Sequence, residues 1–160
     1  MSQKLIANWL KTIIIGIGVC GLLLFGVLLP TFTQTLHLPS LDPLNHTVIV
    51  WLTFLWIAAI PCYAVLVFAW KVASHIGNDR AFSIENAKLV NRISVLAAAD
   101  SVFFFLGNIV LLIANMNHPV ILLASFIIIF IGIAISVAAN VLSHLIMKAQ
   151  VLQEQSDFTI

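Results

Sequence analysis

The sequence predicts an all-α fold, namely a polytopic membrane protein whose four transmembrane helices form a bundle with both termini in the cytoplasm. Hydrophobic residues make up 62% of the 160 residues and charged residues only 8%, whereas soluble domains carry about 25% charged residues. Four stretches are long and apolar enough to cross a bilayer. Every Lys and Arg then falls on one side of the membrane. We therefore expect a single membrane domain over residues 1–160, with the lipid bilayer as a partner.

The low charge argues against several classes of function. The formal net charge is +1, which gives no overall field that would attract nucleic acid. The two cysteines do not make a disulfide framework, and no gathered His or carboxylate ligands accompany them. The sequence contains no Gly-rich phosphate loop, no paired-carboxylate site and no HExxH motif. We therefore expect no enzymatic activity, no cofactor, no metal and no direct contact with nucleic acid.

The four spans follow from the lengths of the apolar runs. They lie near residues 12–29, 48–70, 93–114 and 120–143. Each span must be a helix, because lipid offers no partner to an open backbone amide and four segments cannot close a barrel. We expect the first span to be a retained anchor rather than a signal peptide, since residues 29–32 offer no small-x-small cleavage site. Pro61 in the second span predicts a helix kink.

The positions of the cations predict the orientation. Two precede the first span, four lie between the second and third spans, and one follows the fourth span: Lys4, Lys11, Lys71, Arg80, Lys88, Arg92 and Lys148. The other two connections contain no Lys or Arg. Because cytoplasmic connections carry the excess of basic residues, this side and both termini are expected in the cytoplasm. Trp9 and Trp70 then fall at the inner interface, and Trp51 falls near the outer one.

Most of the chain that could bind a protein partner is expected on the inner side. The inner side holds a loop over residues 71–92 and a tail over residues 148–160, whereas the outer connections are short. In the loop, Ser83 is a candidate N-cap for an amphipathic helix that leads into the third span. The tail is expected to continue the fourth helix beyond the bilayer. The candidate partner-binding residues are Phe82, Glu85, Arg92, Glu154, Asp157, Phe158 and Ile160.

Asp100 is the one carboxylate inside a span. A charge at bilayer depth is costly, so an intramembrane Asp is a functional hypothesis by default. Asp100 follows Arg92 by about two helical turns, which places it in the cytoplasmic third of the bilayer. Two interpretations stay open, namely a structural polar contact and a relay for protons or ions.

Small and polar residues recur on the last two spans. On the fourth span they stand at intervals of four: Gly132, Ser136, Asn140, His144 and Lys148. On the third span, Asp100 and Asn108 are eight residues apart and share a face. Folding the two spans as a hairpin predicts that the two stripes face each other, with Asp100 level with Ala134 and within reach of Ser136. The alternative is that small residues let the helices approach while the polar ones add only modest stability.

Two short segments resemble a known family. The segment AFSIENAKLVNRI covers residues 81–93, and the ending EQSDFTI covers residues 154–160. Both look like the bacterial membrane family called domain of unknown function 2975. The resemblance implies a multi-pass protein of the bacterial cytoplasmic (inner) membrane, often encoded beside a small helix-turn-helix regulator. It implies no catalytic residues.

Three functions fit these observations. The leading hypothesis is a regulatory or interaction protein that binds a cytoplasmic partner, such as a helix-turn-helix regulator, through the inner loop and the C-terminal tail. The competing hypothesis is a transporter or channel component that works as a homo-oligomer and uses Asp100 to couple protons to substrate movement. The third is an immunity-type membrane protein that protects the cell against a membrane-active peptide. The sequence does not separate the third hypothesis from the first.

Overall fold

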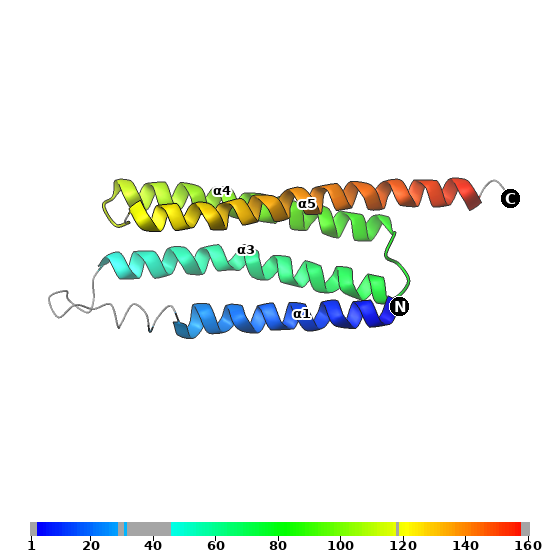
Figure 1. Cartoon of the computed structure of the whole chain (residues 1–160), viewed down its shortest axis with the longest axis horizontal. Helices are drawn as coiled ribbons and strands as arrows, with labels where there is room; N and C mark the ends of the chain where they lie inside the picture. Colours follow the sequence, from blue (N-terminus) through cyan, green and yellow to red (C-terminus); the bar gives the residue numbers. More distant parts are fainter. Residues whose placement is uncertain (1–2, 29–30, 32–45, 118, 158–160) are drawn as a thin grey trace.

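The computed structural model of the chain describes residues 3–28, 31, 46–117 and 119–157. These residues form helices that run side by side (Figure 1). The helices are α1 (Gln3–Leu23), which continues into a short π-helix η1 (Leu24–Leu28), α3 (His46–Gly77), α4 (Ile84–Ile113) and α5 (Pro119–Asp157). Four helical stretches are long and apolar enough to cross a membrane. The prediction of an all-α protein with four membrane helices is therefore confirmed.

The helices are longer than the predicted spans. A helix of 30 residues, the length of α4, measures about 45 Å, whereas the hydrocarbon core of a bilayer is about 30 Å thick. The additional turns lie mainly at the end where α3 stops and α4 begins. Only residues 78–83 separate these two helices, so most of the expected loop over residues 71–92 is helix.

The connection between α3 and α4 follows the predicted capping pattern. Ser83 has extended backbone angles, with φ −110° and ψ 151°, and its Oγ accepts a hydrogen bond of 3.2 Å from the amide of Asn86. Glu85 lies in the first turn of α4, where a negative charge suits the positive end of the helix dipole. Asp79 adopts φ 58° in the preceding turn, a conformation that Asp tolerates better than most residues. The amphipathic helix expected before the third span is thus the first part of α4.

The helices pack in chain order rather than around a common centre. Among the described residues, α1 packs on α3, α3 on α4 and α4 on α5, and α1 contacts neither α4 nor α5. Figure 1 shows the α1–α3 pair and the α4–α5 pair as two layers, with the N- and C-terminal ends of the described chain at the same end. The bundle is therefore open, and its outer helices turn broad apolar faces to the lipid.

Two glycines allow close contacts with α3. A Cβ atom at Gly21 would lie 2.9 Å from the hydroxyl of Tyr63, which also donates a hydrogen bond of 3.4 Å to the carbonyl of Gly18. A Cβ atom at Gly107 of α4 would overlap the ring of Phe54. Because glycine has no side chain, Tyr63 of α3 packs against the backbone of α1 at Gly21, and Phe54 of α3 packs against the backbone of α4 at Gly107. Pro61 lies inside α3, and the helix continues through it.

Candidate functional site

The contact between α4 and α5 is lined by small and polar residues, which we call the polar seam. On α4 the seam residues are seven apart: Ala87, Ser94, Ser101 and Asn108. On α5 they are Ser125, Gly132, Ser136 and Ser143. A step of seven residues falls only about 20° short of two full turns, so such residues stay on one face over a long helix. Their small side chains let the two backbones approach closely.

The seam residues meet in antiparallel pairs. Near the end where α4 begins, Ser143 donates a hydrogen bond of 2.8 Å to the carbonyl of Ala87. Ser94 and Ser136 form the next pair, with their hydroxyl oxygens 3.2 Å apart. Gly132 then lies against Ser101, because a Cβ atom at Gly132 would overlap the Ser101 hydroxyl. The seam therefore fixes the register of α4 against α5 over several turns.

Asn108 forms the centre of a buried network at the other end of the seam. Its side chain is fully buried, with 0% exposure. Its Nδ2 donates to the carbonyl of Phe104 at 2.8 Å, and its Oδ1 accepts from Ser125 Oγ at 2.9 Å and from Asn117 Nδ2 at 3.1 Å. The network joins α4, α5 and the turn between them. Asn108 thus belongs to the helix contact, as the predicted stripe on α4 required.

The predicted stripe on α5 is correct only in part. Gly132 and Ser136 face α4, but Asn140 and His144 are exposed. Each step of four residues overshoots a helical turn by about 40°, so His144 is rotated by about 80° from Ser136. The helix contact follows alternating steps of four and three instead. Ser143, which the interval of four does not include, therefore faces α4 at the level where His144 was expected.

Asp100 points to α3 rather than to α5. Cys62 Sγ donates a hydrogen bond to Asp100 Oδ2 at 3.4 Å. The expectation that Asp100 reaches Ser136 is wrong, because Ser136 pairs with Ser94. The second carboxylate oxygen, Oδ1, is buried and has no hydrogen-bond partner among the described residues. The Asp100–Cys62 hydrogen bond therefore joins α4 to α3 inside the apolar part of the bundle.

Three cations lie over aromatic rings at the end where α3 stops and α4 begins. Lys11 Nζ is 5.3 Å from the centre of the Trp70 ring. Lys71 Nζ and Arg92 Cζ are each 5.9 Å from the centre of the Phe68 ring. These distances are within the range of a cation–π interaction. The interactions hold charged groups from α1, α3 and α4 at one level of the bundle.

The last turns of α5, Met147–Asp157, form what we call the C-terminal extension. Ile146 still packs in a small buried cluster with Ala87 and Val90 of α4. Beyond it, the side chains of Val151 and Leu152 are 53% and 65% exposed. Of the candidate partner-binding residues, Phe82, Glu85 and Arg92 are exposed near the same end. The side chains of Glu154 and Asp157, and the whole of Phe158 and Ile160, lie outside the described part of the chain.

An apolar groove runs along α4 and α5 beside the polar seam. It has a volume of about 450 Å³, and its lining residues are Ala98, Ser101, Val102, Phe105, Phe126, Ile129, Phe130, Ile133 and Ser136. The only polar side chains in this lining, Ser101 and Ser136, are already hydrogen-bonded. The groove suits an apolar chain and offers no group for chemistry.

Comparison with known proteins places this architecture in a family. The family described as a protein of unknown function (DUF2975) matches residues 39–160. The chain belongs to this family. The part of this chain that matches DUF2975 contains α3, α4 and α5. It therefore contains the polar seam and the Asp100–Cys62 pair. The resemblance predicted from the two short segments is confirmed.

A curated relative supports the same assignment. The uncharacterized membrane protein YoaS of Bacillus subtilis (strain 168) is 29% identical over 150 residues, which cover 92% of this chain and 92% of the relative. No solved structure matches the chain. Together with its four apolar helices, this similarity identifies the DUF2975 chain as a membrane protein.

Proposed function

We propose that this protein is a membrane-embedded interaction protein that binds a cytoplasmic protein through the C-terminal extension and the connection between α3 and α4. The proposal includes the location, a bacterial cytoplasmic membrane with both termini inside. The distribution of Lys and Arg supports this orientation, because every one of them lies in the first half of α1, near the α3–α4 connection or late in α5. Cytoplasmic segments of membrane proteins carry such an excess of basic residues.

The observation that carries the proposal is the length of α5. The buried contact with α4 reaches Ile146, and the helix continues to Asp157. These further residues span about 16 Å at 1.5 Å per residue. Figure 1 shows this end of α5 running past the α3–α4 connection. The extension therefore presents side chains, such as Val151 and Leu152, that the rest of the described chain leaves exposed.

The composition of the extension suits a protein partner. Its last residues are mostly polar, with Gln150, Gln153, Gln155 and Ser156 among them, so this part of α5 belongs in water rather than in lipid. Met147, Val151 and Leu152 are nevertheless exposed. An apolar edge on a polar helix is stabilised when a partner buries it. Binding of this edge in a groove of another protein satisfies that requirement.

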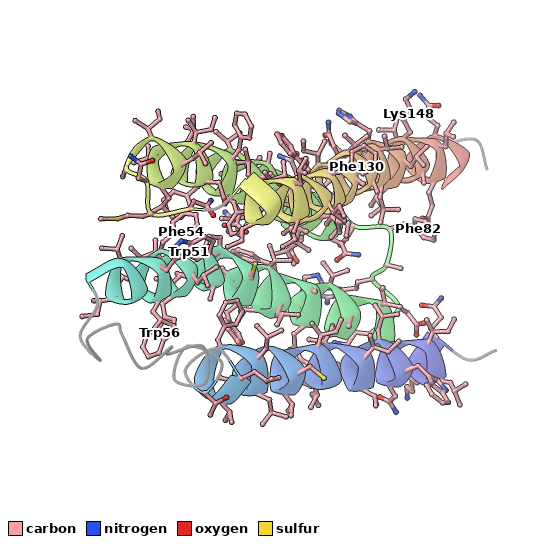
Figure 2. All side chains as sticks on the ribbon, turned by 60° about the vertical axis from the view of Figure 1, so that its left-hand side comes forward. Trp51, Phe54, Trp56, Phe82, Phe130 and Lys148 are labelled. Carbon is pink, nitrogen blue, oxygen red and sulfur yellow. The ribbon has the colours of Figure 1, made fainter. Side chains whose placement is uncertain are left out.

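The α3–α4 connection adds a second contact at the same end. Phe82 is 59% exposed there, and Figure 2 shows it at the end of the molecule that also carries Lys148. Exposed aromatic side chains are frequent anchors in protein interfaces. A partner that binds the extension is therefore within reach of a second apolar anchor.

The class of partner that fits best is a helix-turn-helix regulator. A DNA-binding protein carries a basic surface, and Glu154 and Asp157 give the extension negative charge at its far end. Opposite charges would steer such a protein to this end of α5. Held at the bilayer, the regulator would be kept away from the chromosome. A ligand that binds the membrane protein more tightly when no regulator is attached would release the regulator.

The test is copurification from the native cell in mild detergent. We expect a helix-turn-helix protein to copurify with the wild-type chain and to be lost from the double variant Val151→Gln and Leu152→Gln. The variant Gln153→Ala changes the same turns without removing the apolar edge, so it should retain the partner. Absence of such a regulator from the wild-type preparation, or its retention by the double variant, would contradict the proposal.

A second candidate function is supported by the unpaired Asp100 Oδ1. In this alternative the chain is a homo-oligomeric transporter or channel component, and Asp100 carries a proton. The test is proton flux in proteoliposomes that contain the wild type or Asp100→Asn. Flux that depends on Asp100 would favour transport, whereas no flux above empty liposomes would exclude it. Asp79→Asn, outside the predicted spans, is the matched control.

A further inference from the structure

Lys71 and Arg92 come together from two helices on one aromatic ring. Lys71 is on α3 and Arg92 is on α4, and both cationic groups are 5.9 Å from the centre of the Phe68 ring. The two charges are therefore separated by no more than twice that distance. Each interaction with the ring face is favourable, and together they place two positive charges near one ring, where an anion can lie beside both.

Among the residues that the structure describes, no carboxylate lies at this level to balance the pair. On α3 and α4, the four residues on either side of Lys71 and of Arg92 include no Asp or Glu. The facing part of α5, near residues 134–142, also contains none, and neither does α1 from Gln3 to Leu23. Glu85 is two helical turns from Arg92, about 10 Å along α4. Within the described part of the chain, the positive charge therefore has no carboxylate beside it and is available to an external anion.

The helices that carry the two cations are firmly joined next to them. Ala73 on α3 is fully buried, and Ala87 and Val90 on α4 are almost so. Val72 packs against this cluster. Because their helices are fixed here, the fold holds the backbones of Lys71 and Arg92 at one level, and their exposed side chains extend from there. A preorganised pair of this kind binds a ligand at a lower entropic cost.

The depth of the pair matches lipid headgroups. Lys71 and Arg92 follow or precede long apolar stretches of α3 and α4, and Trp70 with Lys11 lies at the same end. Tryptophan and basic residues are typical of the level of the lipid phosphates. Basic pockets between transmembrane helices are known to bind anionic headgroups. Arg also presents a planar fork of donors that matches phosphate oxygens.

We infer that Lys71 and Arg92, together with the Phe68 ring that both cations approach, form a binding site for the phosphate of an anionic phospholipid. The anionic class follows from the charge of the site. A zwitterionic lipid would bring its own ammonium group close to two cations, whereas phosphatidylglycerol brings a phosphate and no positive charge. The site is independent of the C-terminal extension and of any partner bound there.

Native mass spectrometry of the full chain in mild detergent tests the site. The probes are phosphatidylglycerol and phosphatidylcholine with the same acyl chains. We expect wild type to prefer phosphatidylglycerol. We expect the variant Lys71→Gln with Arg92→Gln to bind it about 30-fold more weakly, because each cation near the surface contributes about 1 kcal/mol and about 1.4 kcal/mol corresponds to tenfold in affinity. Restoring the charge with Arg92→Lys in place of Arg92→Gln should recover part of the loss.

The control removes the same charge from the same end of the molecule. Lys4→Gln with Lys11→Gln leaves Phe68, Lys71 and Arg92 unchanged, so its affinity for phosphatidylglycerol should stay within about threefold of wild type. An equal loss in both double variants would show general surface attraction and overturn the site. Inorganic phosphate that competes as well as the lipid would also overturn it, because the ligand would then be a free anion. Thermal unfolding of each variant verifies that the fold is intact.

Discussion

Ser94 on α4 and Ser136 on α5 donate hydrogen bonds to each other's backbone carbonyl. Ser94 Oγ lies 2.8 Å from the carbonyl oxygen of Ser136, and Ser136 Oγ lies 2.9 Å from that of Ser94. Each hydroxyl therefore bonds to the backbone of the opposite helix instead of its own. Such an exchange needs two small side chains at one level of the contact, and it ties α4 to α5 at the middle of the polar seam.

Replacing this pair should weaken the hairpin modestly. We expect Ser94→Ala and Ser136→Ala each to lower the free energy of unfolding by about 0.6 kcal/mol, the average for hydrogen bonds between membrane helices, and by no more than about 1.7 kcal/mol. The double variant should lose less than the sum of the single ones, because the pair shares its contacts. Reversible unfolding in mixed detergent measures all three values. Val137→Ala, on the exposed side of α5, is the control, and additive losses would argue against a coupled pair.

The contact between Gly132 and Ser101 gives a sharper prediction. A Cβ atom at Gly132 would force the Ser101 hydroxyl away from the carbonyl of Ala97, to which it donates at 2.8 Å. We therefore expect Gly132→Ala to be about 1 kcal/mol less favourable for stability than the same substitution at an open helical site, because this bond is lost. Adding Ser101→Ala should recover most of the loss, because the hydroxyl in the way is then absent.

A glycine in open space provides the comparison for Gly132. A Cβ atom at Gly16 of α1 meets nothing within 4 Å. Because Ala is a better helix former than Gly by up to about 1 kcal/mol, Gly16→Ala should leave stability unchanged or raise it. The same unfolding assay measures both variants. If Gly132→Ala behaved like Gly16→Ala, close approach of the helices at Gly132 would be disproved.

Substitution of two asparagines distinguishes the observed contact between α4 and α5 from the contact that intervals of four residues predict. Asn108→Ala removes the acceptor for Ser125 and Asn117 at a fully buried position, so it should cost about 1 to 3 kcal/mol. Asn140→Ala changes an exposed side chain and should stay within about 0.5 kcal/mol of wild type. Unfolding of the two variants side by side checks this. Equal losses would place Asn140 in the contact after all.

The sequence predicts the fold much better than the site. Hydropathy alone identifies four helices, because lipid allows no other spanning structure with so few segments. It does not give their ends: α3 runs to Gly77 and α4 starts at Ile84, since backbone hydrogen bonds continue past the last apolar residue. Only Ser83, a polar side chain at a recognisable N-cap, marks one of these ends in advance.

The polar contacts between α4 and α5 are predictable from the sequence only with the correct spacing of residues along each helix. The step of seven from Ala87 to Asn108 is present in the sequence and indicates the face of α4 that meets α5, whereas intervals of four on α5 lead away from it to His144. The partner of Asp100 could not be found in this way. Cys62 is 38 residues away on another helix, and no spacing within one helix reveals which helix a side chain faces.

The last prediction concerns the end of the bundle opposite the cations. Trp51 Nε1 donates a hydrogen bond of 2.9 Å to the carbonyl of Met116, in the turn between α4 and α5. Figure 2 shows Trp51 and Phe54 between α3 and the α4–α5 pair, whereas Trp56 lies on the other side of α3. Because this bond joins α3 to the tip of the hairpin, it resists separation of the two layers at this end.

Trp51→Phe keeps an aromatic ring but removes the donor, so we expect a loss of about 0.5 to 1.5 kcal/mol in the free energy of unfolding. It should also speed amide hydrogen exchange in the α4–α5 turn, since local opening there becomes easier. Trp56→Phe is the matched control, because the Trp56 side chain is 58% exposed. A turn that exchanged equally fast in both variants would mean that the Trp51 bond does not hold the hairpin tip to α3.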